Sequence, residues 1–368
     1  MRIAILSLNP RHNYGGILQS YALKKVLEGM GHDVRVICKE RHVPEFGIKQ
    51  IIRWPYRLLR KLMGSKDTRI FIEHYYNKQN DRKYQNTDKF VDKYLAPRFV
   101  RSLKEIKESE FDAFVVGSDQ VWRPRYFKAQ FKAKMSEAYL SFTKDWDVKR
   151  IAYSASFGVD RWEYSEEETK ECAKFLKFFD AVSVREESGI RLCKKHLERD
   201  AYQLCDPTFL LTRSDYLSLI PKNQHQSSGS LLVYSLDENE ELDKLVQKII
   251  AFKGLEPFYL LNPFHQAGLP SLETWINSFI DAACVLTDSY HACIFSLIFN
   301  KPFFVINNDN RGCARIETLL KTFNQQYRLI HSSAEYDDNF NYYLLDNVEE
   351  VSNQLRNKSI QFLVAGLS

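Results

Sequence analysis

His291 is the residue whose type and position best suit chemistry. It follows the apolar run 284–287 and precedes a second apolar run that contains Ile294 and Phe295, so we expect it where a buried strand passes into a helix. A helix dipole disfavours a cation in the first turn. A histidine there fits a site with an anionic ligand, to which an imidazolium can donate a proton. A purely structural histidine remains the alternative, because a lone histidine is a weak signal.

Arg185 lies at the end of another predicted strand, 181–184. A guanidinium at a strand end can bind a carboxylate or phosphate through two parallel hydrogen bonds. The alternative is a surface salt bridge to Glu186 or Glu187, which contributes little.

Two further loops follow predicted strands. Residues 13–16 (Asn-Tyr-Gly-Gly) directly precede a helical pattern, where glycines and a helix N-terminus suit an anion. The glycines alone favour the alternative, a simple tight turn that joins strand to helix. The loop is neither a P-loop nor a GxGxxG fingerprint. Residues 117–122 (Gly-Ser-Asp-Gln-Val-Trp) suit contact with a sugar or an anion. Alternatively, Ser118 or Asp119 simply caps the next helix.

Strand and helix patterns that alternate along the chain position these loops. The fold class that they predict is α/β, with two domains that each hold a mostly parallel sheet. Ligands of such sheets lie beyond the carboxyl ends of the strands. The predicted strands are 3–6, 34–37, 113–116, 151–154, 181–184, 231–234, 258–261, 284–287 and 303–306. The predicted units are an N-terminal domain 1–221 with a basic helical insertion at about 41–101, a linker at 221–230, a C-terminal domain 231–345 and a final helix 346–368.

Composition limits the function classes. The formal charge of +5 on 368 residues is modest, so it does not indicate nucleic acid but suits an anionic partner. The 7 cysteines are odd in number and form no CxxC pair, which predicts free thiols and neither a disulfide framework nor a metal site. The apolar N-terminus is too short for a signal peptide, and no apolar stretch reaches the length of a membrane span. We therefore expect a cytoplasmic protein.

Six motifs in register resemble the polysaccharide pyruvyl transferase family over about residues 10–320. They are Asn-Tyr-Gly-Gly-Ile-Leu-Gln-Ser-Tyr-Ala-Leu at 13–23, Gly-Ser-Asp-Gln-Val-Trp at 117–122, Ser-Ala-Ser-Phe-Gly at 154–158, Val-Arg-Glu-Glu-Ser at 184–188, Asp-Pro-Thr at 206–208 and Thr-Asp-Ser-Tyr-His at 287–291.

This resemblance implies two Rossmann-like domains that face each other across a cleft, as in GT-B glycosyltransferases. It also implies a transferase of the EC 2.5.1 type that moves pyruvate from phosphoenolpyruvate to a sugar of a capsular or exopolysaccharide precursor as a cyclic ketal, without a metal or cofactor. His291 would be the acid. The donor site expected on this basis joins Arg185 of the N-terminal domain to Ser289, Tyr290 and Arg315 of the C-terminal domain. The cleft or acceptor side is Asn13, Tyr14, Gly15, Gly16, Gln19, Ser118, Asp119, Gln120 and Trp122.

One departure concerns the donor site. Many relatives have an arginine two residues before the histidine, where this chain has Ser289. We expect either Arg315, which follows the next strand, or backbone amides with Ser289 to replace the missing cation. A surface pair of Arg315 with Asp309 or Glu317 is the alternative.

The insertion contains a basic amphipathic pattern at 48–63, with Trp54 and Pro55 near its middle. Such a helix suits an anionic membrane surface and a lipid-linked acceptor, which would place the protein at the inner face of the plasma membrane. A helix that packs its apolar face on the domain core is the alternative, and Pro55 interrupts or kinks it in either case.

Two other functions remain open: a nucleotide-sugar-dependent glycosyltransferase of the GT-B type, and a sugar-binding relative without activity. The base for the attacking hydroxyl is also open among Asp119, Asp206 and Asp288.

Overall fold

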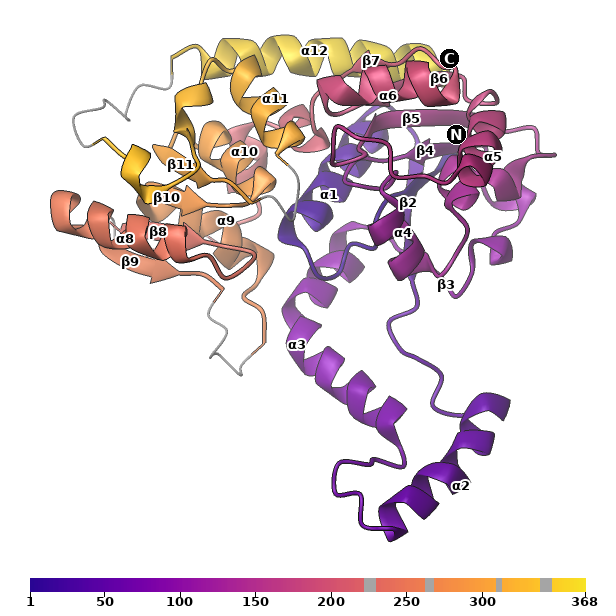
Figure 1. The fold of residues 1–368 in the computed structure, drawn as a ribbon. Helices are drawn as coiled ribbons and strands as arrows, with labels where there is room; N and C mark the ends of the chain where they lie inside the picture. Colours follow the sequence, from indigo (N-terminus) through magenta and orange to yellow (C-terminus); the bar gives the residue numbers. More distant parts are fainter. Residues whose placement is uncertain (222–229, 262–267, 309–312, 338–345) are drawn as a thin grey trace.

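The computed structural model has two α/β halves connected at their inner faces (Figure 1). It describes residues 1–221, 230–261, 268–308, 313–337 and 346–368. Most of the predicted linker, 222–229, lies outside these residues.

The N-terminal half is built on a seven-stranded sheet in the order β3-β2-β1-β4-β5-β6-β7, and every neighbouring pair is parallel. Its central strands β1 and β4 are almost entirely apolar and, apart from Arg2, buried on both faces, as is typical of parallel strands. The strands are β1 (Arg2–Leu6), β2 (Asp33–Lys39), β3 (Arg98–Val100), β4 (Ala113–Val116), β5 (Lys149–Ala155), β6 (Ala181–Val184) and β7 (Tyr202–Gln203).

Alternate residues of these strands pack on opposite faces. Ile3 and Ile5 face one apolar cluster, whereas Ala4 and Leu6 face the other. The helices of this half are α1 (Tyr14–Gly29), α2 (Ile48–Leu62), α3 (Ile72–Tyr94), α4 (Pro124–Phe131), α5 (Glu166–Leu176), α6 (Glu187–Leu197) and α7 (Arg213–Leu217).

The C-terminal half has a five-stranded parallel sheet in the order β12-β11-β10-β8-β9. Its strands are β8 (Ser230–Tyr234), β9 (Glu256–Tyr259), β10 (Ala282–Thr287), β11 (Phe303–Ile306) and β12 (Leu329–Ile330). Its helices are α8 (Glu240–Lys253), α9 (Leu272–Asp281), α10 (Tyr290–Ile298) and α11 (Ala314–Thr322). Two parallel sheets with flanking helices confirm the predicted fold class.

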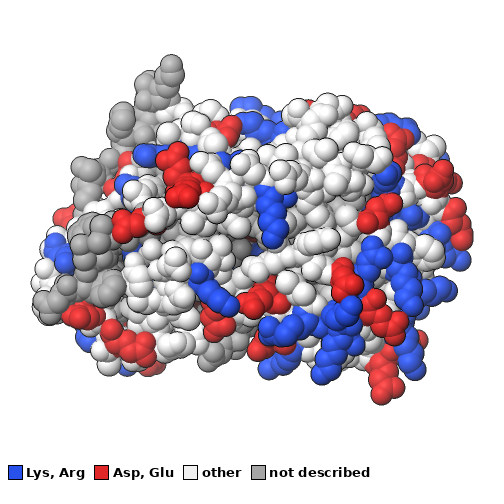
Figure 2. Space-filling model, turned by 90° about the horizontal axis from the view of Figure 1, so that it is seen from above, with Lys and Arg blue, Asp and Glu red and all other residues white. Residues whose placement is uncertain are grey.

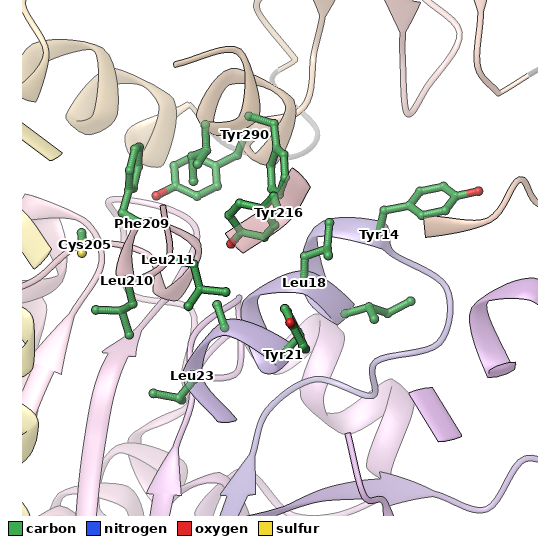
Figure 3. Packing of buried hydrophobic residues seen from close by; sticks show 14 of the residues in the cluster. Tyr14, Leu18, Tyr21, Leu23, Cys205, Phe209, Leu210, Leu211, Tyr216 and Tyr290 are labelled. Carbon is green, nitrogen blue, oxygen red and sulfur yellow. The ribbon is translucent and has the colours of Figure 1, made fainter. Parts of the chain in front are cut away.

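One apolar cluster continues from the N-terminal half into the C-terminal half. Tyr14 of α1 stacks on Trp275 of α9, with ring centroids 5.7 Å apart. Phe209, in the 3₁₀ segment Pro207–Leu210, stacks on Phe323 at 5.3 Å. Figure 3 shows Tyr14, Phe209 and Tyr290 gathered from three elements into this region. A shared core of this kind holds the facing loops of the two halves against each other.

The final helix, α12 (Val348–Leu367), follows the C-terminal half in sequence but returns to the N-terminal half (Figure 1). Arg356 donates to the carbonyl oxygens of Phe209 at 3.0 Å and Leu211 at 3.1 Å. Gly366 lies against Ile151, where a Cβ would come within 3.1 Å of its side chain. The helix therefore connects the end of the chain to the first sheet.

The segment 41–101 forms a helical hairpin and ends in the edge strand β3. Helix α2 projects from the body at the tip of this hairpin (Figure 1) and contains no buried residue. The alternative that α2 packs its apolar face on the domain core is therefore wrong. Of the two effects predicted for Pro55, an interruption does not occur, since the helix continues through this residue from Ile48 to Leu62.

The observed elements differ from the predicted ones mainly at edges. Strand β9 begins two residues before the predicted 258–261, and the short strands β3, β7 and β12 were not predicted. The strands β3, β7 and β12 are only two or three residues long, so they leave too short an apolar pattern to recognise. No described helix is both long and apolar enough to cross a bilayer.

Candidate functional site

Loops from the carboxyl ends of both sheets meet between the two halves. His291 in the first turn of α10 packs directly on Gly15 in the first turn of α1: a Cβ added to Gly15 would lie 2.1 Å from His291 Cγ and 2.2 Å from Nδ1. Because any side chain at Gly15 would occupy the space of the imidazole, a glycine is required there. The glycine loop therefore forms the wall that faces the histidine.

Arg185 and Asp206 form a buried ion pair beside this wall. The guanidinium Nη2 lies 3.0 Å from Asp206 Oδ2, and the two side chains are 1% and 0% exposed. Arg185 also donates to Ser118 Oγ, from Nε at 3.0 Å and from Nη2. The other Asp206 oxygen, Oδ1, accepts from the backbone N–H of Thr208 at 2.9 Å and from its hydroxyl at 2.7 Å. The pair is thus hydrogen-bonded on both sides, as buried charges must be.

Their mutual attraction outweighs the cost of burial. Burial alone would raise the pKa of Asp206, but Arg185 first, then His291 and Thr208, hold that pKa well below its usual value. Burial likewise opposes the charge of Arg185, yet the Asp206 carboxylate raises the pKa of the guanidinium. Both groups are therefore charged in the folded protein.

His291 approaches the same carboxylate from the C-terminal half. Its Nε2 lies 3.5 Å from Asp206 Oδ2, too long for a good hydrogen bond, and this buried nitrogen has no hydrogen-bond partner among the described residues. Arg185 and His291 therefore converge on one carboxylate, with the imidazole nitrogen still able to bond a ligand.

Arg315 reaches the cluster from α11. The ring of Tyr290 lies between two guanidinium groups, 4.9 Å from that of Arg185 and 5.3 Å from that of Arg315. Arg315 Nη1 lies 4.0 Å from Asp119 Oδ1, which is a loose contact. Burial, followed by the charge of Arg185, lowers the pKa of Arg315.

Two donors of these arginines have no acceptor. Arg185 Nη1 and Arg315 Nε are buried and make no hydrogen bond within the described part of the chain. An unsatisfied buried donor is costly, so the arrangement favours an anion that would accept from both.

The space beside these donors is small. A cavity of about 30 Å³ is lined by Arg185, Asp206, Tyr290 and Arg315, with apolar side chains of the 3₁₀ segment Pro207–Leu210 and of α11. A single water needs roughly 10–15 Å³, so this volume holds water and no small organic anion. A ligand can enter only if the halves separate or side chains move.

A comparison of the sequence with protein-family profiles shows which family the chain belongs to. The profile of the polysaccharide pyruvyl transferase family matches residues 13–310, which is most of the chain. The chain belongs to this family. No curated protein matches it in a sequence search.

The solved structures with a similar arrangement have low sequence identity to this chain. The UDP-GlcNAc 2-epimerase of Neisseria meningitidis, bound to UDP-GlcNAc, has 9% identity and a TM-score of 0.49, and the match covers 100% of this chain and 99% of that one. The enzyme of the same name from Methanocaldococcus jannaschii has 14% identity and a TM-score of 0.45, over 99% and 98%. A heptosyltransferase of Escherichia coli with ADP has 12% identity and a TM-score of 0.38, over 83% and 87%. Similarity at this level says nothing about what this chain binds.

The family's first motif has a structural role as well as a place in the site. Asn13 caps α1 by accepting from the N–H of Gly15 at 3.0 Å, and Tyr14 donates to the carbonyl oxygen of Pro270 in the other half at 2.8 Å. Gly16 faces Asp119, whose Oδ2 lies 3.4 Å from the position of an added Cβ. The loop therefore joins the halves and shapes the wall.

Three residues expected in the cleft make contacts within the N-terminal half. Trp122 is fully buried in the core, stacked on Tyr139 at 4.9 Å, so it does not line the cleft. Gln19 is fully buried and donates to Ser7 Oγ and the Gly16 carbonyl, both at 3.0 Å. Gln120 accepts from Arg123 at 3.0 Å. A strand-end position alone does not distinguish a cleft residue from a core residue.

The structure gives the partners of Ser289, Asp288 and Arg185, whereas Asp309, an expected alternative partner of Arg315, lies outside the described residues. Ser289 uses its N–H on Thr287 Oγ1 at 3.0 Å, so that amide is not available to an anion. Asp288 accepts from Leu236 N–H and from Asn308, both at 2.8 Å, and connects loops within the C-terminal half. Arg185 does not pair with its neighbouring glutamates: Glu186 accepts from the backbone of 157 and 158, and Glu187 pairs with Lys321.

The main element that sequence reasoning missed is the ion pair of Asp206 with Arg185. The Asp-Pro-Thr motif was visible, but the two residues belong to different loops. Their contact follows from the adjacency of β6 and β7. Among the described residues, no cluster of three or more His, Cys, Asp or Glu side chains could hold a metal ion.

Proposed function

We propose that this family member transfers pyruvate from phosphoenolpyruvate to two hydroxyls of a sugar in a polysaccharide or lipid-linked oligosaccharide precursor. The reaction would be of the EC 2.5.1 type and need no metal or cofactor. The observation that carries the proposal is the convergence of His291, Arg185 and Arg315 between the halves, with a free bonding position on each. Phosphoenolpyruvate has two anionic groups and an enol carbon that must gain a proton.

The proposed steps balance as follows. The His291 imidazolium gives its proton to C3 of the enol, which becomes a methyl group and leaves C2 as an oxocarbenium-like centre. A first sugar hydroxyl bonds to C2 and loses its proton. A second hydroxyl then forms the second C–O bond while the C2–O bond to phosphate breaks. Inorganic phosphate leaves with one hydroxyl proton. The other is taken from its hydroxyl by a base and then returns to His291.

The arginines bind the donor in this proposal. Arg185 Nη1 and Arg315 Nε supply hydrogen bonds to the carboxylate and phosphate, and Arg315 takes the place of the arginine that many relatives have at position 289. Asp206 is a positioning residue: it holds Arg185 and keeps a negative charge 3.5 Å from the imidazole.

Asp119 is our proposal for the base. It has a φ of +63°, a conformation that non-glycine residues adopt rarely and often at functional sites. Its carboxylate lies between the glycine wall and Arg315, and its 4.0 Å contact with Arg315 is looser than the 3.0 Å pair of Asp206 with Arg185. Asp119→Asn should lower kcat by about 10²–10⁴-fold while the donor KM changes little.

The test is incubation with phosphoenolpyruvate and a panel of soluble and lipid-linked sugars, with measurement of phosphate release and of pyruvate added to the product by mass. His291→Ala should abolish both signals, and Arg315→Ala should raise the donor KM. An unchanged KM in Arg315→Ala would contradict the role of that arginine.

Nucleotide diphosphate release from a sugar nucleotide would instead indicate a glycosyltransferase. Equal absence of turnover in wild type and His291→Ala would indicate a sugar-binding relative.

A further inference from the structure

The exposed helix α2 has its apolar face turned away from the protein. At 100° per residue, the side chains of Ile48, Ile52, Leu59, Leu62 and Met63 fall on one side of the helix. Ile48 is 80% exposed, Leu62 76% and Met63 78%. A monomeric soluble protein rarely exposes a continuous apolar surface of this extent.

The opposite, polar side of α2 holds it to the rest of the hairpin. Arg57 makes two hydrogen bonds to the Glu73 carboxylate of α3, at 2.7 and 2.8 Å, and a third to the carbonyl oxygen of Ile70 at 3.1 Å. The orientation is therefore the reverse of a helix that covers a core. It is fixed by the partly buried polar contacts of Arg57, together with the ring contact of Trp54 with Phe71.

The flanks of the apolar face indicate what covers it. Lys49, Arg53, Arg60 and Lys61 are exposed, and the range 48–63 has no acidic residue. Basic side chains beside an apolar face complement the anionic headgroups of a lipid surface, whereas a second copy of the same face would bring like charges together.

Aromatic rings extend the surface on one flank. Trp54 contacts Phe46 and Phe71, with ring centroids 5.7 and 5.3 Å apart, beside a groove of about 260 Å³. Phe46 and Phe71 are themselves exposed. Tryptophan and phenylalanine are favoured at the boundary between headgroups and acyl chains.

The hairpin also lies near the space between the halves. At the base of α3, Asn86 donates to the carbonyl oxygen of Leu269 in the C-terminal half at 3.0 Å. From there to the start of α3 the helix extends about 20 Å, at about 1.5 Å per residue. Helix α2 is thus held at a fixed distance from the two halves.

We propose that α2, with Phe46 and Phe71, binds an anionic lipid surface, with the helix parallel to it and its apolar face in the headgroup region. This inference does not rest on the proposed chemistry, because binding needs neither donor nor acceptor. The occupant is the lipid surface itself. A second copy of the chain is an outcome that the test distinguishes.

The test uses the full-length chain in flotation with vesicles. Vesicles of phosphatidylcholine with phosphatidylglycerol should carry the protein, and vesicles of phosphatidylcholine alone should carry it weakly. Leu59→Glu with Leu62→Glu should reduce the bound fraction at least tenfold. The matched control is Phe252→Glu, at an exposed apolar residue in the other half, which should bind as wild type does.

A second variant addresses the charges. Arg53→Glu with Arg60→Glu should weaken binding at least tenfold, since each basic side chain contributes roughly fivefold near an anionic surface. Lys170→Glu with Lys358→Glu changes the net charge equally at exposed sites far along the chain and should have little effect.

Three outcomes would overturn the inference. The first is that the protein does not float with anionic vesicles. The second is that it floats but the α2 variants float equally well. The third is that it binds no lipid and instead forms a dimer in solution, which the leucine variants dissociate. Phosphate release with a soluble sugar should be the same in all α2 variants, so a failure of the proposed chemistry is measured separately from a failure of docking.

Discussion

Asp206→Asn tests the most unusual electrostatic feature of the site. The change keeps the size of the side chain but removes the charge that faces Arg185. The guanidinium then stays almost fully buried with no opposite charge in contact, since the pair is 1% and 0% exposed. Removal of one partner of a buried pair costs about 3–5 kcal/mol of stability. The hydrogen bonds from Thr208 to Oδ1 can remain, so the loss measures the charge.

Two controls define the comparison. Asp200 makes a 2.7 Å pair with Lys194 on the surface, where both side chains are largely exposed, so Asp200→Asn should change stability by no more than about 1 kcal/mol. The double variant Arg185→Met with Asp206→Leu removes both charges. It should be less destabilised than the sum of its single changes, because no unpaired charge remains.

The assay is urea unfolding of the full chain at pH 7 and at lower pH. The folded protein holds the pKa of Asp206 below its unfolded value of about 3.9, so the carboxylate contributes its full stability above about pH 4 and loses it as the pH falls further. The difference in the free energy of unfolding between wild type and Asp206→Asn should therefore shrink only below about pH 4. An Asp206→Asn cost equal to that of Asp200→Asn would refute the reasoning.

Three further predictions concern the wall, the last helix and the thiols. Gly15→Ala should displace the His291 ring and lower kcat by about 10²-fold. The control is Gly16→Ala, which has ordinary space for a Cβ and should change kcat much less. Similar kcat values for the two variants would contradict the packing of His291 on Gly15. Arg356→Ala should lower the free energy of unfolding by about 1–3 kcal/mol because two buried carbonyls lose their donor, and Lys358→Ala, at an exposed position, should not. A thiol reagent should react with one cysteine of the folded protein and with all seven of the unfolded protein. The reason is that six cysteines are buried, and burial raises the pKa values of their thiols. Fast reaction of several thiols in the folded protein would contradict this prediction.

Most of the secondary structure could be predicted from apolar patterns. The runs 113–116, 181–184 and 303–306 are strands with those bounds, because a fully buried parallel strand leaves a continuous apolar signal. The sequence also indicated which loops matter, since His291, Arg185 and Gly15 all follow strands whose carboxyl ends face the space between the halves.

Other features could not be predicted. Trp122 follows a strand as Arg185 does, yet one is in the core and the other is in the site. The pattern of α2 was equally consistent with a packed and an exposed helix, since both need an apolar side. In the structure Arg57, on the polar side of α2, pairs with Glu73 of α3, and the apolar side is exposed.

The sequence by itself determined the two parallel sheets, the kinship of the chain and the loops that carry its chemistry, because burial periodicity and motif spacing are local properties. Only the tertiary structure decided that Asp206 neutralises Arg185, that His291 lies against Gly15 and that Arg315 reaches the ring of Tyr290. These contacts join residues far apart in the chain, and they depend on strand order and on how the halves pack. No pattern within a single segment encodes those two properties.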